Sequence, residues 1–216
     1  MRGRFITIEG TEGVGKTTNI EYIKQWLDAK GISFVNTREP GGTPLAEEIR
    51  QVLLANRDEA VCSKAELLLM FAGRAQHIDQ VIEPQLAAGH WVLCDRFTDA
   101  TYAYQGAGRE MGYDLIARLE TMVQGSMRPD LTLILDIPVE LGLARASKRS
   151  EPDRFELEKT DFFNRVRQAY LSTAEKSPER YKVIDASKSL AQVQQQIDDT
   201  LSDFLNNQQS EVSTSD

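Results

Sequence analysis

Residues 10–17 read Gly-Thr-Glu-Gly-Val-Gly-Lys-Thr, which fits the pattern Gly-x-x-x-x-Gly-Lys-[Ser/Thr] without a mismatch. An alternating apolar run at 5–8 precedes this octet, and residues 18–23 follow it with apolar side chains at helical spacing. A strand, a glycine-rich loop and a helix in this order are the context of a phosphate-binding loop. The glycines let backbone N–H groups converge on an anion, and the helix N-terminus adds its positive dipole end. The sequence therefore predicts that a nucleoside triphosphate binds here.

The side chains of this loop have individual expected roles. Lys16 can reach the β- and γ-phosphates, and the Thr17 hydroxyl can ligate Mg²⁺. The competing interpretation is a glycine-rich turn that starts a helix and binds nothing. We predict that the triphosphate contacts the whole segment, namely Gly10, Thr11, Glu12, Gly13, Val14, Gly15, Lys16, Thr17 and Thr18.

Length and composition indicate one globular domain. The chain has 216 residues, of which 41% are hydrophobic and 27% are charged, ordinary values for a globular protein. No apolar run approaches the ~20 residues that cross a bilayer, so no membrane partner is expected. The first strand begins so early that we expect no signal peptide. Cys62 and Cys94 suggest no disulfide framework, which makes the cytoplasm the expected location.

The net charge of −8 argues against a general nucleic-acid-binding surface, and we predict no nucleic-acid partner. A polyphosphate ligand nevertheless needs positive charge around it. We therefore expect a few arginines placed at the site rather than a basic face.

Apolar segments and helix-period segments alternate along the chain. The alternation predicts βαβ crossovers, and near-continuous apolar strands indicate a parallel sheet buried on both faces. The fold class is therefore a three-layer α/β sandwich, with a five-stranded parallel sheet between helices. We expect one domain over 1–205 and a disordered tail over 206–216. The expected strands are 5–9, 34–37, 91–94, 131–136 and 182–184, and the expected helices are 17–29, 45–55, 64–88, 114–124, 139–149, 161–176 and 190–205.

Ligands of such folds gather at the carboxyl ends of the strands. The second strand leads into Thr37-Arg-Glu-Pro-Gly-Gly-Thr-Pro44, in which Thr43 can cap the next helix. A structural turn explains the glycines and prolines but not the charged pair at its start. Our hypothesis is that Arg38 faces an anionic substrate and that Glu39 orients it.

The third strand ends in Asp95-Arg96-Phe97. An aspartate at this place can bind Mg²⁺ directly or through water, and Arg96 can clamp a phosphoryl oxygen. The alternative is a surface ion pair without a ligand. The fourth strand also ends in an aspartate, Asp136, which we predict to cap the helix that begins after Pro138.

Phe71 and Arg74 are candidates for contacting a base. They lie three positions apart on one helix face, where a ring can stack and a guanidinium can donate to a carbonyl oxygen. The alternative is that Phe71 packs in the core, since an apolar run precedes it. Thr101, Tyr104 and Gln105 follow Phe97 at similar helical spacing and by themselves indicate no role.

A polar segment at about 145–156 contains several basic residues and a proline. Basic residues at a helix C-terminus are often only partners of the helix dipole. The phosphate loop, however, has no arginine at its variable positions, and phosphoryl transfer needs cationic stabilisation. We therefore interpret 145–156 as a lid that supplies a cation.

These segments, in this order, resemble the bacterial thymidylate kinase family. The distinctive parts are Thr-Arg-Glu-Pro-Gly-Gly-Thr at 37–43, Asp-Arg-Phe at 95–97 and Tyr-Gln-Gly at 104–106, and the resemblance spans about 5–205. It implies a P-loop NTPase fold and a Mg²⁺-dependent transfer of the γ-phosphoryl of ATP to dTMP. The product is dTDP, on the way to dTTP. The family forms homodimers, which the resemblance also implies.

The resemblance further implies roles for single residues. For dTMP, Phe71 stacks on thymine, Arg74 binds its O4, Thr101 and Gln105 contact the base, Tyr104 packs against the deoxyribose, Glu12 reads the 3′-hydroxyl, and Arg38 and Arg96 hold the phosphate. For the transfer itself, the implied catalytic residues are Lys16, Asp95, Arg96 and a lid arginine, Arg149 or Arg154, with Mg²⁺ on Thr17 and Asp95. The Glu39–Pro40 bond is a candidate cis peptide.

Three other interpretations compete. A signalling GTPase should show Asn-Lys-x-Asp, which is absent from the sequence. A non-catalytic nucleotide sensor explains neither Asp95-Arg96 nor the basic lid. Another nucleotide or deoxynucleoside kinase on the same scaffold is the nearest alternative, because base identity depends on few residues.

Overall fold

The computed structural model describes residues 2–147 and 153–213, with the side chains of 208–213 left out. A five-stranded, all-parallel sheet lies at its centre, with the strand order β2-β3-β1-β4-β5. This confirms the predicted fold class. The strands are β1 (Phe5–Glu9), β2 (Phe34–Arg38), β3 (Trp91–Asp95), β4 (Leu131–Asp136) and β5 (Tyr181–Asp185).

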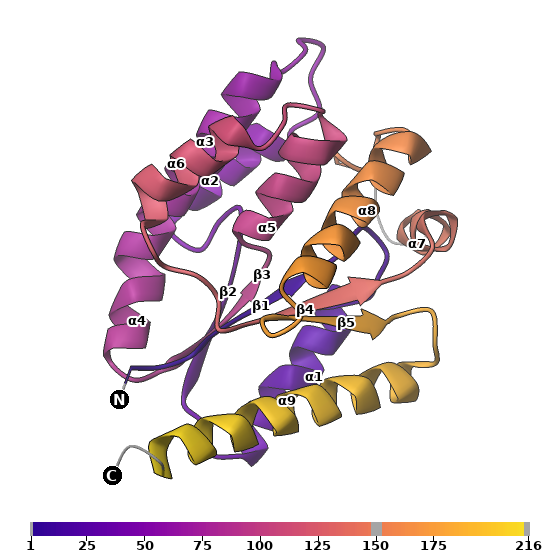
Figure 1. The fold of residues 1–216 in the computed structure, drawn as a ribbon. Coiled ribbons are helices and arrows are strands. Elements are labelled where there is room, and N and C mark those ends of the chain that lie inside the picture. The colour runs from indigo at the N-terminus through magenta and orange to yellow at the C-terminus, as the bar shows by residue number, and fades with distance from the viewer. Residues whose placement is uncertain (1, 148–152, 214–216) are drawn as a thin grey trace.

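One face of the sheet is covered by α1 (Lys16–Ala29) and α9 (Leu190–Ser213), which lie side by side in Figure 1. Because side chains alternate along a strand, Ile6 and Ile8 point to this face. They pack in one buried cluster with Ile23 of α1 and Ile197 of α9.

The opposite face is covered by α8 (Thr160–Lys176), with α4 (Glu83–Ala87) towards the β3 side of the sheet (Figure 1). Ile134 of β4 packs with Phe163 of α8, whereas Phe5 of β1 packs with Leu86 of α4. Helices therefore cover both faces, as the sequence predicts.

The segment predicted as one helix over 64–88 is divided in three. It comprises α3 (Ser63–His77), a π-helical turn η1 (Ile78–Ile82) and α4. Pro84 near the start of α4 has no N–H to donate to the carbonyl four residues earlier, and wider turns are a common accommodation at such points.

A helical segment that the sequence analysis left unassigned follows β3. It consists of α5 (Thr98–Thr101) and the π-helical η2 (Tyr102–Gly108), and it packs against α8. A Cβ atom at Gly108 would lie 2.5 Å from the Phe162 ring, so glycine permits this close approach. The other helices are α2 (Pro44–Leu54), α6 (Asp114–Gln124) and α7 (Val139–Ala146).

Two further differences concern helix ends. Asp136 does not cap α7, because its carboxylate accepts two hydrogen bonds from Arg167, at 2.7 and 2.8 Å. The capping hypothesis is therefore wrong, and a partner distant in sequence is the reason.

At the C-terminus α9 reaches Ser213, so part of the 206–216 segment, for which the sequence predicts disorder, is described as helix. Glycine and proline, which would end a helix, are absent from 190–213.

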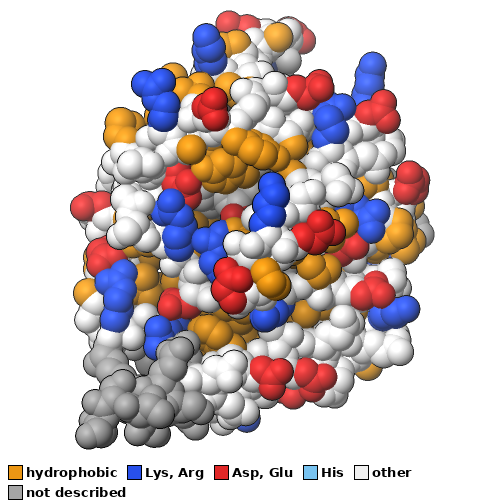
Figure 2. All heavy atoms as spheres, in the orientation of Figure 1, with side chains coloured by type: hydrophobic (Ala, Val, Ile, Leu, Met, Phe, Trp, Pro, Cys, Tyr) orange, Lys and Arg blue, Asp and Glu red, His pale blue; other side chains and the backbone are white. Residues whose placement is uncertain are grey.

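Acidic and basic side chains are interspersed over the face seen in Figure 2. Within the described residues, no helix is both long enough and apolar enough to cross a membrane.

Candidate active site

A cleft opens at the carboxyl edge of the sheet, where the strand exits meet. Its lining combines the phosphate loop with residues from α2, α3, η2 and the segment that follows 148–152. The lining residues are Glu12, Gly13, Val14, Gly15, Lys16, Thr17, Glu39, Pro40, Arg50, Leu54, Met70, Arg74, Asp95, Arg96, Phe97, Ala100, Thr101, Tyr104, Gln105, Asp153 and Phe155.

The phosphate loop forms one end of this cleft, with Lys16 at the start of α1. The Lys16 ammonium lies 3.4 Å from the carbonyl oxygens of Gly10 and Thr11. Desolvation lowers the pKa of Lys16, and the charge of Arg96 lowers it further. Gly10, Thr11 and Thr18 lie behind the lining or beside it, whereas Glu12 to Thr17 line the cleft.

The loop is set against α7 by two glycines. A Cβ at Gly13, whose φ is +71°, would lie 1.9 Å from the carbonyl oxygen of Gly142. A Cβ at Gly142 would in turn lie 2.6 Å from the carbonyl oxygen of Glu12. The two backbones therefore touch, and this fixes the loop relative to the helix that leads into 148–152.

Asp95 at the end of β3 is a candidate metal ligand. Its Oδ1 atom is buried and, among the described residues, has no hydrogen-bond partner. It lines the cleft together with Thr17, and such oxygen atoms suit a hard cation such as Mg²⁺. No group of three or more His, Cys, Asp or Glu residues in the described part of the chain could hold a metal by itself.

Arg96 projects into the cleft from a left-handed backbone, with φ of 69°. Its guanidinium donates to Glu12 at 2.7 Å and lies 4.7 Å from the centre of the Tyr104 ring. The Tyr104 hydroxyl donates to the same Glu12 oxygen at 2.9 Å. The carboxylate in the phosphate loop is therefore paired with a cation, which offsets its repulsion of phosphates.

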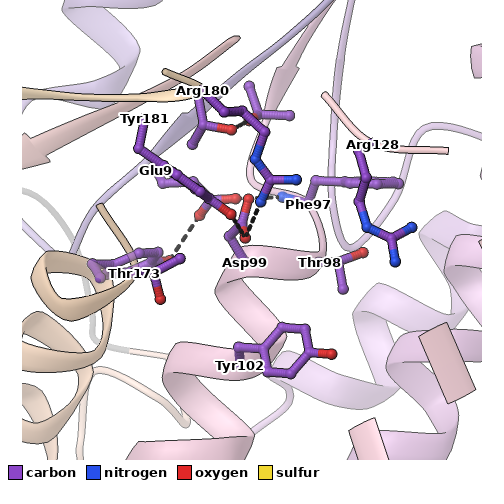
Figure 3. Close-up of polar contacts among 12 residues, drawn as sticks. Glu9, Phe97, Thr98, Asp99, Tyr102, Arg128, Thr173, Arg180 and Tyr181 are labelled. Atoms are coloured by element: carbon purple, nitrogen blue, oxygen red, sulfur yellow. Dashed lines mark hydrogen bonds and ion pairs between the residues drawn. The ribbon is translucent and has the colours of Figure 1, made fainter. Parts of the chain in front are cut away.

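Two carboxyl groups with raised pKa values, those of Glu9 and Asp99, lie close enough to affect each other's charge. Glu9 accepts hydrogen bonds from the Phe97 backbone N–H and the Tyr170 hydroxyl, both at 2.7 Å. Burial raises the pKa of Glu9 to about 8, and the charge of Asp99 adds to this effect. Asp99 accepts from the Tyr181 hydroxyl and from Arg180 (Figure 3). Burial likewise raises the pKa of Asp99, to about 6, although Arg180 opposes the shift. Through the Phe97 N–H, Glu9 holds the backbone next to Arg96.

The pair Arg38 and Glu39 does not work together as we expected. The Arg38 guanidinium is half-exposed and pairs with Glu47 at 2.8 Å, and it lines a neighbouring cleft rather than the central one. Glu39 is buried and accepts from Arg74 at 2.7 Å and lies 3.0 Å from His77. Adjacent residues at a strand end point to opposite sides, which separates the two side chains.

Arg50 is a cleft residue that the sequence analysis missed. It lies on α2 and donates to the carbonyl oxygen of Pro40 at 2.8 Å. Burial lowers the pKa of Arg50, and the positive charge of Arg38 contributes. The sequence signal that could have identified Arg50 is its position beside the apolar face of this helix, where Ala46 and Leu53 are buried. The Glu39–Pro40 peptide of this turn is cis, as considered from the sequence.

Arg74 is buried and has an unpaired donor. Its Nε donates to Glu39, and its Nη2 donates to Thr101 at 3.0 Å and to the Phe97 carbonyl at 3.2 Å. Its Nη1 atom is buried and has no partner in the described structure. Arg74 lines the cleft, so this free donor can serve a ligand.

Phe71 lies in the core rather than in the cleft. Its ring is 2% exposed and packs with Leu67 and Ile116, while Arg74 lies over it at 4.8 Å. The residue of α3 that lines the cleft beside Arg74 is Met70. Neighbouring residues are rotated by about 100° around a helix, so a shift of one position changes the face. Residues four apart share a face at least as well as residues three apart, and Met70 precedes Arg74 by four.

The second helical group lines the cleft. Thr101, Tyr104 and Gln105 of α5 and η2 are all buried and all face it. Thr101 positions the Arg74 guanidinium through the bond given above. The helical spacing noted in the sequence is present here, in a segment that is not among the predicted helices.

The lid is only partly described. Arg149 lies outside the described residues. Arg154 does not line the cleft, and its guanidinium pairs with the buried Glu66 at 2.7 Å and donates to the Leu53 carbonyl at 2.9 Å. Asp153 and Phe155, its neighbours, do line the cleft.

Comparison with known proteins identifies relatives of the whole chain. Residues 8–197 match the family model described as thymidylate kinase. A thymidylate kinase from Teredinibacter turnerae is 58% identical, over 95% of this chain and 100% of that protein. One from Pseudomonas fluorescens is 60% identical, over 95% and 98%. A crystal structure of thymidylate kinase from Ehrlichia chaffeensis superimposes with a TM-score of 0.74 and 32% identity, covering 93% of this chain and 99% of that one.

Proposed function

Because the chain belongs to the thymidylate kinase family and is thus an enzyme that phosphorylates dTMP for dTTP synthesis, we propose that it uses Mg·ATP as the donor. The observation that carries this proposal is the single cleft in which the phosphate loop meets three inward arginines, Arg50, Arg74 and Arg96. A donor and an acceptor can lie end to end in such a cleft, with the phosphoryl groups between them.

Mg²⁺ would be held by the Thr17 hydroxyl and by Asp95, directly or through water. The unpaired buried Oδ1 of Asp95 supports this assignment. When bound, the ion neutralises phosphate charge and orients the donor. Lys16 lies at the same end of the cleft and supplies a second positive charge.

The acceptor phosphate would lie between Arg50 and Arg96. Both guanidiniums line the cleft, and both have anionic or carbonyl partners that keep them in place. Two cations that line the same cleft suit a dianion. Arg38 would instead stabilise the turn at Gly42 through its ion pair with Glu47. The Glu47 carboxylate also accepts a hydrogen bond from the Gly42 N–H, at 3.0 Å.

The base would lie between Met70 and the surface formed by Thr101, Tyr104 and Gln105. The free Nη1 of Arg74 would donate to the O4 of thymine. Met70 offers a flexible, polarisable side chain for contact with an aromatic ring. Glu12, close to Tyr104, would accept from the 3′-hydroxyl of the sugar.

The transfer itself needs no strong general base, since a phosphate acceptor is already ionised at neutral pH. Catalysis would consist of positioning together with charge stabilisation by Lys16, Arg96 and the lid. Arg149 is the remaining lid candidate for the transferring group, because Arg154 is engaged by Glu66.

We also propose a homodimer and a cytoplasmic location. The large exposed apolar side chains include Leu68 on α3 with Leu115 and Met122 on α6, which packs against α3. Such side chains suit a protein interface. Both cysteines are free thiols, which fits a reducing compartment.

The test of the donor and acceptor assignment is ADP release from Mg·ATP with dTMP, dUMP, dCMP, dGMP, AMP and thymidine in turn. The proposal expects strong preference for dTMP, inactivity with thymidine, and loss of turnover when EDTA removes Mg²⁺. Preference for another monophosphate would favour a different nucleotide kinase. Release of ADP without any acceptor would favour an ATPase or a nucleotide sensor.

A further inference from the structure

Glu66 of α3 is a fully buried carboxylate that joins three separate parts of the chain. Its Oε1 accepts from the Gln105 side-chain amide at 2.8 Å and from Arg109 at 3.3 Å. Its Oε2 accepts from Arg154 at 2.7 Å and from Arg109 at 3.3 Å. It does not line the cleft itself, but Gln105 does.

The charge of Glu66 decides which end of the Gln105 amide faces it. Two guanidiniums hold the carboxylate, and an ionised carboxylate can only accept hydrogen bonds. The amide nitrogen of Gln105 must therefore point to Glu66. The amide oxygen, which has no partner among the described residues, is then the polar atom that Gln105 offers to the cleft.

The cleft next to this oxygen contains the opposite kind of group. Arg74 offers its unpaired Nη1 donor, and Thr101, which accepts from Arg74, precedes Gln105 by four residues in the same helical segment. An acceptor beside a donor matches a pyrimidine ring with an N3–H and an O4. It mismatches cytosine, whose N3 accepts and whose N4 donates.

We propose that Glu66 is a positioning residue for base specificity: it fixes the Gln105 amide so that an acceptor faces the base, and thereby favours thymine over cytosine. This inference rests on the proposed function and names a determinant of its selectivity. The two arginines have a supporting part, because their positive charges offset that of the buried carboxylate.

The test is the ratio of kcat/KM for dTMP to that for dCMP in wild type and in Glu66→Gln. A neutral amide at position 66 can donate as well as accept, so the Gln105 amide can turn and donate to the N3 of cytosine. We expect the ratio to fall about tenfold or more, the effect of one exchanged hydrogen bond, while the KM of ATP stays within about twofold. An unchanged ratio in a folded variant overturns the proposal.

The matched control is Glu158→Gln. Glu158 also pairs with Arg109 but contacts neither Gln105 nor Arg154 in the described structure. The Glu158→Gln variant should leave the ratio of kcat/KM for dTMP to that for dCMP unchanged. If Glu158→Gln lowers the ratio as much as Glu66→Gln, a general disturbance around Arg109 is the cause, and the proposal fails.

A second variant tests the same idea if Glu66→Gln does not fold. Gln105→Leu removes the acceptor, so the ratio should fall without any change at Glu66. In a Gln105→Leu background, Glu66→Gln should have no further effect on the ratio. Retention of full discrimination by Gln105→Leu overturns the inference. A wild type that does not prefer dTMP at all contradicts the proposed function instead, which keeps the two failures apart.

Discussion

At the scale of the residue, Arg38 and Arg50 differ in the partner that each guanidinium binds and in the cleft that each one lines. Arg38 is occupied by Glu47 outside the central cleft, whereas Arg50 lines the cleft and has a carbonyl oxygen as its partner. The side chains that line the central cleft, Arg50 among them, are the ones placed to meet a substrate anion there. Sequence position alone favoured Arg38, because it lies directly at the end of a strand.

Replacement of Arg50 by Ala should therefore raise the KM for dTMP about 10- to 100-fold, the cost of one charge-assisted hydrogen bond. The KM for ATP should change little. Arg38→Ala is the control, and it should affect the KM for dTMP less than Arg50→Ala does. Steady-state kinetics with both substrates would measure this, and a larger effect of Arg38→Ala would reverse the assignment.

Glu9 gives a prediction about pH. Its pKa is raised from 4.5 to about 8 in the folded protein, so the folded state binds a proton more tightly than the unfolded chain. The resulting stabilisation is complete below about pH 4.5 and is lost as the pH rises towards 8. Wild type should lose stability between pH 5 and pH 8, and Glu9→Gln should lose less, by about 1 kcal/mol or more.

Urea unfolding of both proteins at pH 5, 6.5 and 8 measures this difference. Asp99 titrates in both proteins and adds the same kind of loss over a lower pH range, up to about 6. Because the charges of Glu9 and Asp99 act on each other, the difference between the two proteins reports the titration of Glu9 together with its coupling to Asp99. Parallel stability profiles would show that Glu9 does not titrate in this range.

At the scale of the element, helix phase decides which side chains reach the cleft. The α3 helix places Met70 and Arg74 on the cleft side and Phe71 in a core cluster with Leu67 and Ile116. The sequence shows that Phe71 and Arg74 lie three positions apart, but it does not show how the helix is oriented relative to the sheet. An error of one residue in helix phase therefore exchanges a core residue for a residue that lines the cleft.

The pair Met70→Ala and Phe71→Ala tests this phase. Phe71→Ala should cost about 3–5 kcal/mol of stability, because it leaves a cavity in a packed cluster. Met70→Ala should destabilise less, since Met70 is only partly buried, but should raise the KM for dTMP several-fold. Thermal unfolding together with kinetics separates the two effects. The assignment fails if Phe71→Ala alone raises the KM and keeps its stability.

At the scale of the whole molecule, arginines gather at the cleft, whereas large exposed apolar side chains occur on α3 and α6. The net charge is −8, yet four arginines lie in or beside one cleft, Arg38, Arg50, Arg74 and Arg96. A few arginines thus supply positive charge at the cleft of an acidic protein, as the sequence analysis expects. Large exposed apolar side chains occur on α3 and α6, on the far side of the molecule from α9 in Figure 1.

If α3 and α6 form the dimer surface, Leu68→Lys with Met122→Lys should convert a dimer into a monomer. A charge that becomes buried at an interface strongly disfavours the free energy of association, whereas a single charge elsewhere on the surface changes it little. Light scattering coupled to size-exclusion chromatography measures the mass. Leu190→Lys on α9, also half-exposed, is the control and should leave the dimer intact. A wild type that is monomeric at micromolar concentration would contradict the dimer proposal.

The sequence by itself determined the fold class, the phosphate loop and the strand exits. These depend on local signals: glycines in a fixed spacing, apolar strands buried on both faces, and charged residues directly after them. All five predicted strands are present, and most of the segments expected at the site line one cleft. The family followed from the same ordered segments.

Only the tertiary structure decided which side chain of each segment lines the cleft. The presence of Met70 rather than Phe71 in the lining, the presence of Arg50 there, and the pairing of Glu39 with Arg74 depend on how the helices are oriented and packed. The same holds for Asp136, which pairs with Arg167, and for Glu66, which holds Gln105. A buried polar group takes its partner from whichever element packs against it, and that packing is not encoded in any single segment.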